Sequence, residues 1–201
     1  MVVDRYDLII RNGDVIDGTG APRRALDVGV RGDRIEKIGD LTGFPADVCV
    51  DASNRIVAPG FIDVHTHDDH ALLSNPSMSF KTSQGVTTVV VGNCGISLAP
   101  LCFSDDRPPA PLDLLGEGYK FPRMADFVAC LEANPPATNA AYLCGHTTLR
   151  VGAMDDLMRP ATEDEISLMR DNLSEALDSG AVGLSTGLAY DPAKSAPTRE
   201  I

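Results

Sequence analysis

The pattern of apolar residues changes at Ala58-Pro59-Gly60, and this change constrains the fold more than any other feature of the 201-residue sequence. Before it, short segments such as residues 26–31 and 34–38 alternate apolar and polar side chains between glycine-containing turns, which predicts a small antiparallel sheet. After it, apolar strands alternate with amphipathic helices, which is typical of βα units around a parallel sheet. The sequence therefore predicts an α/β protein with a small β domain at residues 1–59 and a second domain at residues 60–201.

Within the first domain, a strand is expected at residues 6–11, followed by a turn at Asn12-Gly13, because this dipeptide favours tight hairpins. Four strands are expected in the second domain, at residues 61–64, 86–91, 139–144 and 181–185. The middle two are β-branched or continuously apolar, as strands covered on both faces should be.

Helix ends are marked by capping residues. Asn75-Pro76 predicts the start of a helix that Gly85 closes. A second helix is expected from Met124 to Asn134-Pro135, and a third after Thr162, which forms a capping box with Glu165 and is followed by the stop Ser179-Gly180.

The length of the second domain limits what it can form. A (β/α)8 TIM barrel needs roughly 250 residues, so the stretch after Gly60 suffices for only about four βα units. The last residues, Pro197-Thr198-Arg199-Glu200-Ile201, look like the start of a further helix. The prediction is the first half of a barrel, truncated.

Composition excludes several classes of protein. Seventeen basic against twenty-nine acidic side chains give a formal charge of −12, which disfavours nucleic acid as a partner. No apolar run of about 18 residues appears, and the N-terminus lacks an export pattern, so the chain is expected to be cytoplasmic and to bind no membrane. The five cysteines contain no C-x-x-C pair and predict neither a disulfide framework nor a zinc ribbon.

A histidine pair follows the first strand of the second domain, in Asp63-Val64-His65-Thr66-His67. Because strand side chains alternate, His65 and His67 are expected to share a face and to grip one divalent ion. Asp63 lies on the same face and is expected to hydrogen-bond a ligand ring as a supporting carboxylate. The roles of Asp68 and Asp69 stay open, and the alternative for the pair is two partly exposed histidines in a turn.

A cysteine stands at the expected end of the second strand, in Gly92-Asn93-Cys94-Gly95. A thiolate is a strong zinc ligand, and the flanking glycines allow close approach of the backbone. A buried apolar thiol is the alternative. We expect Cys94 to bind metal together with His65 and His67.

Several motifs resemble known enzymes. Residues 58–67 resemble the first barrel strand of the amidohydrolase superfamily, whose members use a metal-activated water to attack an amide or related carbon. Many of them bridge two metals with a carboxylated lysine at the end of the fourth strand, but here that end reads Gly183-Leu184-Ser185-Thr186-Gly187-Leu188. Residues 83–95, 145–150 and 187–190 are instead similar to the N-acyl-D-amino-acid deacylase (D-aminoacylase) family.

The resemblance implies roles for individual residues. Cys94 would hold one tightly bound Zn²⁺, and His65 with His67 would form a second, weaker site. Tyr190 would contact the carboxylate or carbonyl region of the substrate. His146 would either orient substrate or satisfy a loop carbonyl.

The resemblance also implies that this chain is the N-terminal portion of such an enzyme. The remaining zinc histidines and the general-base aspartate would lie beyond residue 201, as would the strands that complete the β-sandwich-like first domain, so the catalytic base is unassigned. The portion alone is expected to be inactive.

The implied activity is zinc-dependent hydrolysis of N-acyl-D-amino acids, small-molecule substrates, to a carboxylate and a free D-amino acid. One alternative is a cyclic-amide hydrolase of the dihydroorotase or hydantoinase type, which the missing lysine disfavours. The other is a non-catalytic amidohydrolase paralogue, which the persistence of His65, His67 and Cys94 disfavours. Substrate side-chain preference and oligomeric state stay open.

Overall fold

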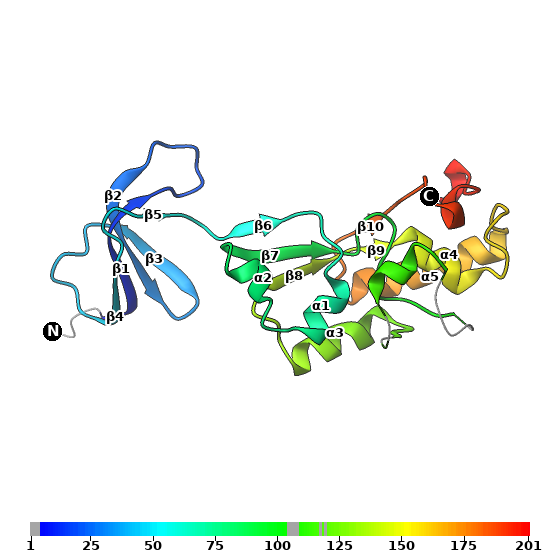
Figure 1. Cartoon of the computed structure of the whole chain (residues 1–201), viewed down its shortest axis with the longest axis horizontal. Coiled ribbons are helices and arrows are strands. Elements are labelled where there is room, and N and C mark those ends of the chain that lie inside the picture. The colour runs from blue at the N-terminus through cyan, green and yellow to red at the C-terminus, as the bar shows by residue number, and fades with distance from the viewer. Residues whose placement is uncertain (1–4, 104–108, 117, 119) are drawn as a thin grey trace. The chain divides into compact units, whose positions relative to one another are not determined.

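The computed structural model describes residues 5–103, 109–116, 118 and 120–201. The chain divides into two compact units, Met1–Pro59 and Gly60–Ile201 (Figure 1). The first unit contains strands and turns, whereas the second combines parallel strands with helices. The expected α/β class is therefore confirmed.

The first unit is a mixed sheet built around its longest strand, β1 (Tyr6–Val15). This strand pairs antiparallel with β2 (Arg24–Arg31), which pairs antiparallel with β3 (Arg34–Gly39). On its other edge β1 pairs parallel with β4 (Ala46–Asp51) and β5 (Ile56–Val57). The expectation of a purely antiparallel sheet was wrong, because the chain passes from β3 to the far side of β1 and returns in the same direction as β1.

Asn12-Gly13 lies inside β1 and does not form the expected hairpin turn. The register against β2 shifts between Ile10 and Gly13, which marks a β-bulge, and Asn12 has a φ of 60°. The backbone N–H of Asn12 donates to Asp27 at 2.9 Å, and its side chain donates to Asp51 at 3.0 Å. Partners on both neighbouring strands thus hold the dipeptide within the sheet.

The second unit contains two parallel sheets. One has the order β6-β7-β8, formed by Phe61–Asp63, Val86–Val91 and Asn139–Tyr142, and the other pairs β9 (Cys144–Gly145) with β10 (Leu184–Ser185). All four expected strands are present, β7 over its whole expected range and the other three shortened or interrupted. The third is interrupted at Leu143, and the fourth is reduced to two residues, although the N–H of Val182 still bonds the carbonyl of Tyr142.

Two of the three expected helices are confirmed. Helix α3 (Met124–Ala133) buries Met124, Phe127 and Leu131, and α5 (Glu163–Asp178) begins with the capping box of Thr162 and Glu165. Their apolar faces join Val89 and Val91 of β7 in the core of this unit. An additional helix, α4 (His146–Ala153), follows β9 directly and was not expected.

The prediction of a helix at residues 76–85 was wrong. Asn75-Pro76 ends a helix, α1 (Asp69–Ser74), with the N–H of Asn75 donating to the carbonyl of Ala71. Proline cannot continue that helix. Met78 then takes a left-handed conformation, and only a single turn, α2 (Ser79–Thr82), forms before Gly85.

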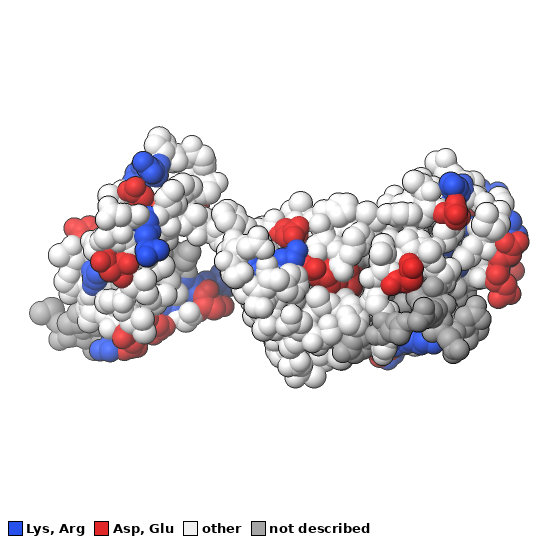
Figure 2. Space-filling view, viewed as in Figure 1, with Lys and Arg blue, Asp and Glu red and all other residues white. Residues whose placement is uncertain are grey.

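Short 3₁₀ turns complete the unit: η1 (Leu112–Leu115), η2 (Asp191–Ala193) and η3 (Thr198–Glu200), the last where a helix start was expected. Across the described residues, every helix is too short or too polar to cross a membrane. On the faces shown in Figure 2, acidic and basic side chains lie interspersed.

Candidate metal centre

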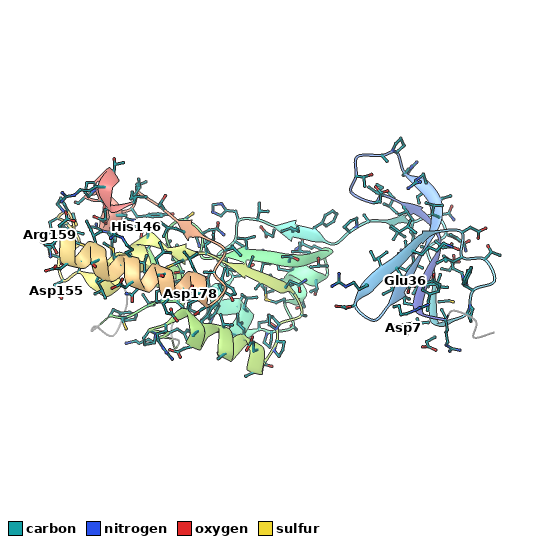
Figure 3. All side chains as sticks on the ribbon, turned by 180° about the vertical axis from the view of Figure 1, so that it is seen from behind. Asp7, Glu36, His146, Asp155, Arg159 and Asp178 are labelled. Carbon is teal, nitrogen blue, oxygen red and sulfur yellow. The ribbon has the colours of Figure 1, made fainter. Side chains whose placement is uncertain are left out.

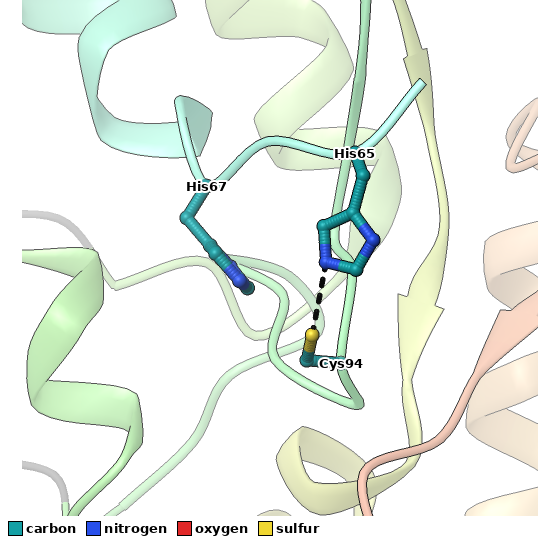
Figure 4. A group of neighbouring side chains, drawn as sticks. All are labelled: His65, His67 and Cys94. Carbon is teal, nitrogen blue, oxygen red and sulfur yellow. Dashed lines mark hydrogen bonds between the residues drawn. The ribbon is translucent and has the colours of Figure 1, made fainter. Parts of the chain in front are cut away.

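His65 and His67 lie in the segment between β6 and α1 (Figure 4). The strand ends at Asp63, two residues earlier than His65, so the histidines follow the strand rather than continue it. The N–H of Thr66, between them, donates to the carbonyl of Val90 in β7 at 3.3 Å. This bond holds the histidine segment against the end of the neighbouring strand.

Cys94 lies in the loop that follows β7, and this loop has an unusual backbone. Gly92, Cys94 and Gly95 have φ angles of 77°, 57° and 76°, in the left-handed region that non-glycine residues rarely occupy. A Cβ at position 92 would lie 2.1 Å from the carbonyl oxygen of Leu143. Glycine at position 92 therefore lets the loop bend tightly against Leu143, which lies between β8 and β9.

The structure brings the three expected ligands together. Nε2 of His65 lies 3.1 Å from Sγ of Cys94 (Figure 4), and one donor atom from each of His65, His67 and Cys94 falls within 4.8 Å of the others. Zinc bonds of about 2.0–2.3 Å place neighbouring ligand atoms roughly 3.5 Å apart in a tetrahedral site. Two imidazoles and a thiolate also form a donor set that suits Zn²⁺.

One imidazole nitrogen in this group lacks a protein partner. Nδ1 of His67 is buried and forms no hydrogen bond within the part of the chain that the structure describes. Burial, followed by the positive charge of His65, lowers the pKa of His67. A neutral imidazole with a free buried nitrogen is the form that binds a metal, so the residues fit such an ion.

Asp63 interacts differently from the expectation. Its Oδ2 accepts from Nζ of Lys81 at 2.6 Å, and its Oδ1 accepts from the backbone N–H of His65 at 3.3 Å, so its partner is the His65 backbone rather than an imidazole ring. The Lys81 bond lowers the pKa of Asp63. Nζ of Lys81 also lies 2.9 Å from Oδ2 of Asp68. This lysine therefore forms ion pairs with both carboxylates that flank the histidines.

The role of Lys81 was not predicted from the sequence. The residue fell within the helix expected at residues 76–85, and a single lysine in a helix does not indicate which side chains it contacts. In the structure the one-turn helix α2 presents it to Asp63 and Asp68 with a side chain only 16% exposed. Only the packing of α2 against the histidine segment reveals this contact.

Asp69 connects the histidine segment to the Cys94 loop. Its buried carboxylate accepts the N–H of Gly92 at 3.3 Å and the N–H of Leu98 at 3.4 Å. Burial raises the pKa of Asp69 to about 6. A single side chain thus bonds backbone groups on both sides of Cys94.

Tyr190 reaches the same group of residues from the segment after β10. Its hydroxyl lies close enough to Cys94 that the negative charge of this side chain, when deprotonated, is the first cause that raises the pKa of Tyr190. Its ring packs against Gly187, where an added Cβ would lie 2.8 Å from the ring. The structure therefore places Tyr190 beside the expected metal ligand.

His146, labelled in Figure 3, is the first residue of α4 and pairs with a different partner. Its Nε2 lies 3.0 Å from Oε1 of Glu200, which also pairs with the fully buried Arg150. Burial lowers the pKa of His146. The structure thus assigns one ring nitrogen to Glu200, and His146 does not join the group formed by His65, His67 and Cys94.

Comparison with known proteins places this chain in a family. The model described as "Amidohydrolase family" matches residues 48–200. The chain is 57% identical to D-aminoacylase from Alcaligenes xylosoxydans xylosoxydans over 98% of its own length and 40% of that protein. It is 50% identical, with a TM-score of 0.94, to N-acyl-D-glutamate deacylase from Bordetella bronchiseptica, covering 98% of this chain and 41% of that one.

The same comparisons bear on the alternatives. D-hydantoinase from Ralstonia pickettii matches only 56% of the chain, at 37% identity, so the cyclic-amide hydrolases are distant relatives. The chain spans about 40% of the length of the deacylases it matches, which agrees with the expectation that it forms a portion of such a protein. By the family model and by identity over nearly its whole length, this chain belongs to the amidohydrolase family and is similar to its D-aminoacylases.

Proposed function

We propose that the whole protein containing this chain hydrolyses the amide bond of N-acyl-D-amino acids, and that Cys94, His65 and His67 hold the zinc it needs. The observation that carries the proposal is the convergence of these three side chains, with Tyr190 near Cys94, just beyond the carboxyl ends of β6 and β7. Active sites of parallel barrels lie at that end of the strands.

Each ligand has a distinct setting. Cys94 would bind the ion most tightly, because a thiolate is the strongest zinc donor of the three and its loop is fixed from several sides. His65 and His67 would hold the same ion or a second, weaker one. Bound zinc supplies Lewis-acid activation of water and of the amide carbonyl.

Other residues of this chain would bind and orient the substrate. The hydroxyl of Tyr190, near Cys94, would bind the carboxylate or carbonyl of an acyl amino acid. Lys81 offsets one of the two negative charges of Asp63 and Asp68, which reduces the repulsion that these carboxylates exert on an anionic substrate. The general base, by resemblance an aspartate, is not among these residues.

The names of the relatives support the class of substrate. One is called a D-aminoacylase, and another is an N-acyl-D-glutamate deacylase solved with zinc and a phosphonate inhibitor that mimics a tetrahedral intermediate. Metal activation alone does not discriminate enantiomers. Selectivity for the D configuration would therefore arise from the pocket around Tyr190 and from residues outside this chain.

The test is a comparison of substrates with the whole zinc-loaded protein. We expect N-acetyl-D-amino acids to be hydrolysed with a kcat/KM at least about a hundredfold above that of the L-enantiomers. Dihydroorotate and hydantoin, assayed alongside, should react far more slowly. A preference for either cyclic amide would refute the deacylase proposal but leave the metal centre in place, whereas zinc content unaffected by Cys94→Ala would refute the metal assignment.

A further inference from the structure

Ser185 bonds the Cys94 loop from the end of β10. Its hydroxyl donates to the carbonyl of Gly92 and accepts the N–H of Gly95 at 2.9 Å, across 93 and 90 residues of sequence. The two partners stand on either side of Asn93 and Cys94. One hydroxyl therefore connects the backbone on the two sides of Asn93 and Cys94.

The loop needs such a bridge because its backbone is not held by a regular sheet or helix. Cys94 has a φ of 57°, a left-handed conformation that is unfavourable for a residue with a Cβ because the Cβ crowds the backbone carbonyl oxygen. Such a conformation persists only when surrounding contacts impose it. Asp69 accepts the N–H of Gly92, and the N–H of Thr148 donates to the carbonyl of Gly95. Among the residues that the structure describes, only Ser185 bonds both glycines and so links the two sides of Cys94.

We propose that Ser185 is a positioning residue that sets the Cys94 thiolate for metal binding, an inference that rests on the proposed metal centre. Ser185 is half-buried and belongs to neither of the segments that carry the ligands. Its contribution is geometric: it holds the thiolate where His65 and His67 converge, so that binding requires little reorganisation. Groups that orient metal ligands influence affinity strongly.

The loop contains a closely matched control. Thr148 of α4 uses its hydroxyl in the same way, accepting the N–H of Ser97 at 2.9 Å and donating to the carbonyl of Ser97 at 2.9 Å. These bonds lie three residues beyond Cys94. Thr148→Val removes an equivalent pair of hydrogen bonds from the same loop and keeps the backbone N–H of Thr148, which donates to the carbonyl of Gly95 at 3.2 Å.

The experiment uses the whole protein, freed of metal and titrated with Co²⁺, whose thiolate charge-transfer band reports bonding to cysteine sulfur. Ser185→Ala should weaken Co²⁺ binding about tenfold to a hundredfold and shift or diminish the band at saturation. Thr148→Val should lower the melting temperature as much or more, because Thr148 is buried, yet keep the wild-type affinity and band. Ser185→Thr, which retains the hydroxyl, should bind close to wild type.

Three results would overturn the proposal. The first is a Ser185→Ala variant with wild-type Co²⁺ affinity and a wild-type thiolate band. The second is a loss of Co²⁺ affinity in Thr148→Val equal to that in Ser185→Ala, which would indicate general loosening of the loop. The third is a Ser185→Thr variant that binds Co²⁺ as weakly as Ser185→Ala. A wild-type protein that shows no thiolate band, or one whose band survives Cys94→Ala, would overturn the metal centre itself. The two failures are therefore distinguishable.

Discussion

Nε2 of His65 lies 3.1 Å from Sγ of Cys94, although 29 residues separate them in the sequence. The cause is the parallel pairing of β6 with β7, whose carboxyl ends meet at one edge of the sheet. The proposed ligands lie just beyond the last residue of each strand. The contact depends on the register of Asp63 against Val89 and on the tight loop at Gly92.

Cys94 and Cys144 make a matched pair of cysteines for metal analysis. Cys94→Ala should remove the tightly bound zinc from the whole protein, whereas Cys144→Ala should retain it. Cys144 is fully buried, and burial raises the pKa of its thiol to about 12, so this cysteine stays protonated and binds no metal. Elemental analysis after mild chelation checks the pair, and full zinc in Cys94→Ala would contradict the assignment.

Tyr190 should contribute to turnover through its hydroxyl. Tyr190→Phe is expected to reduce kcat/KM by the equivalent of roughly 1–3 kcal/mol, if its bond to substrate forms in a dry site. Tyr142→Phe is the control, because its hydroxyl donates to the carbonyl of Ser179 at 3.2 Å, away from the metal ligands. Steady-state kinetics on an N-acetyl-D-amino acid measure both, and equal losses would argue against a specific role for Tyr190.

Gly92 should tolerate no side chain. Gly92→Ala places a Cβ 2.1 Å from the carbonyl oxygen of Leu143, in addition to the cost of a left-handed alanine. Gly20→Ala carries only that conformational cost, about 1 kcal/mol, because Gly20 has a similar φ of 84° and no atom within 4 Å of the new Cβ. Chemical denaturation of both variants should show a much larger loss for Gly92→Ala, and equal losses would mean that the loop moves aside freely.

Glu200 should be important for stability. Its side chain is fully buried beside Arg150, and it also accepts the N–H of Ala161 at 3.3 Å. Glu200→Gln leaves the buried guanidinium of Arg150 without its counter-charge and should cost about 3–5 kcal/mol of unfolding free energy. Arg199→Gln breaks only the exposed pair with Glu163 and should cost less than about 1 kcal/mol. Urea titrations compare the two variants.

Glu165 should make stability depend on pH in acid. The bond from Arg159, together with the capping box, lowers the pKa of Glu165 to about 2 from an ordinary 4.5. A lowered carboxyl pKa in the folded state contributes stability above pH 4.5, and this contribution is lost as the pH falls toward 2. Glu165→Gln should therefore be less stable than wild type at pH 7, and the difference should shrink in acid.

The control for this prediction is Glu163→Gln, which removes a carboxylate from the same helical turn but leaves the bond between Thr162 and residue 165 intact. Melting temperatures of the three proteins from pH 7 down to pH 2 measure the effect. A constant difference between wild type and Glu165→Gln over this range would contradict the linkage.

The sequence alone determined the features that depend on local patterns. The alternation of strands and helices after Gly60, the apolar stripe of α3 and the capping box at Thr162 are short-range signals, and the corresponding elements are present. That His65, His67 and Cys94 lie together was also predictable, because each follows the end of a parallel strand and the surrounding motifs resemble those of amidohydrolases. Asn75-Pro76 and Asn12-Gly13 were misread because a capping or turn residue serves equally at a helix end or within a bulge, and only neighbouring segments decide which.

Tertiary structure decided the contacts that join distant segments. Nothing in the sequence indicates that Ser185 bonds Gly92 and Gly95, that Lys81 reaches Asp63 and Asp68, or that His146 pairs with Glu200. Such hydrogen bonds carry no periodic signal, since each depends on the relative placement of two elements to within a few tenths of an ångström. Sequence patterns fix which residues are available at the strand ends, whereas packing fixes which polar atoms meet.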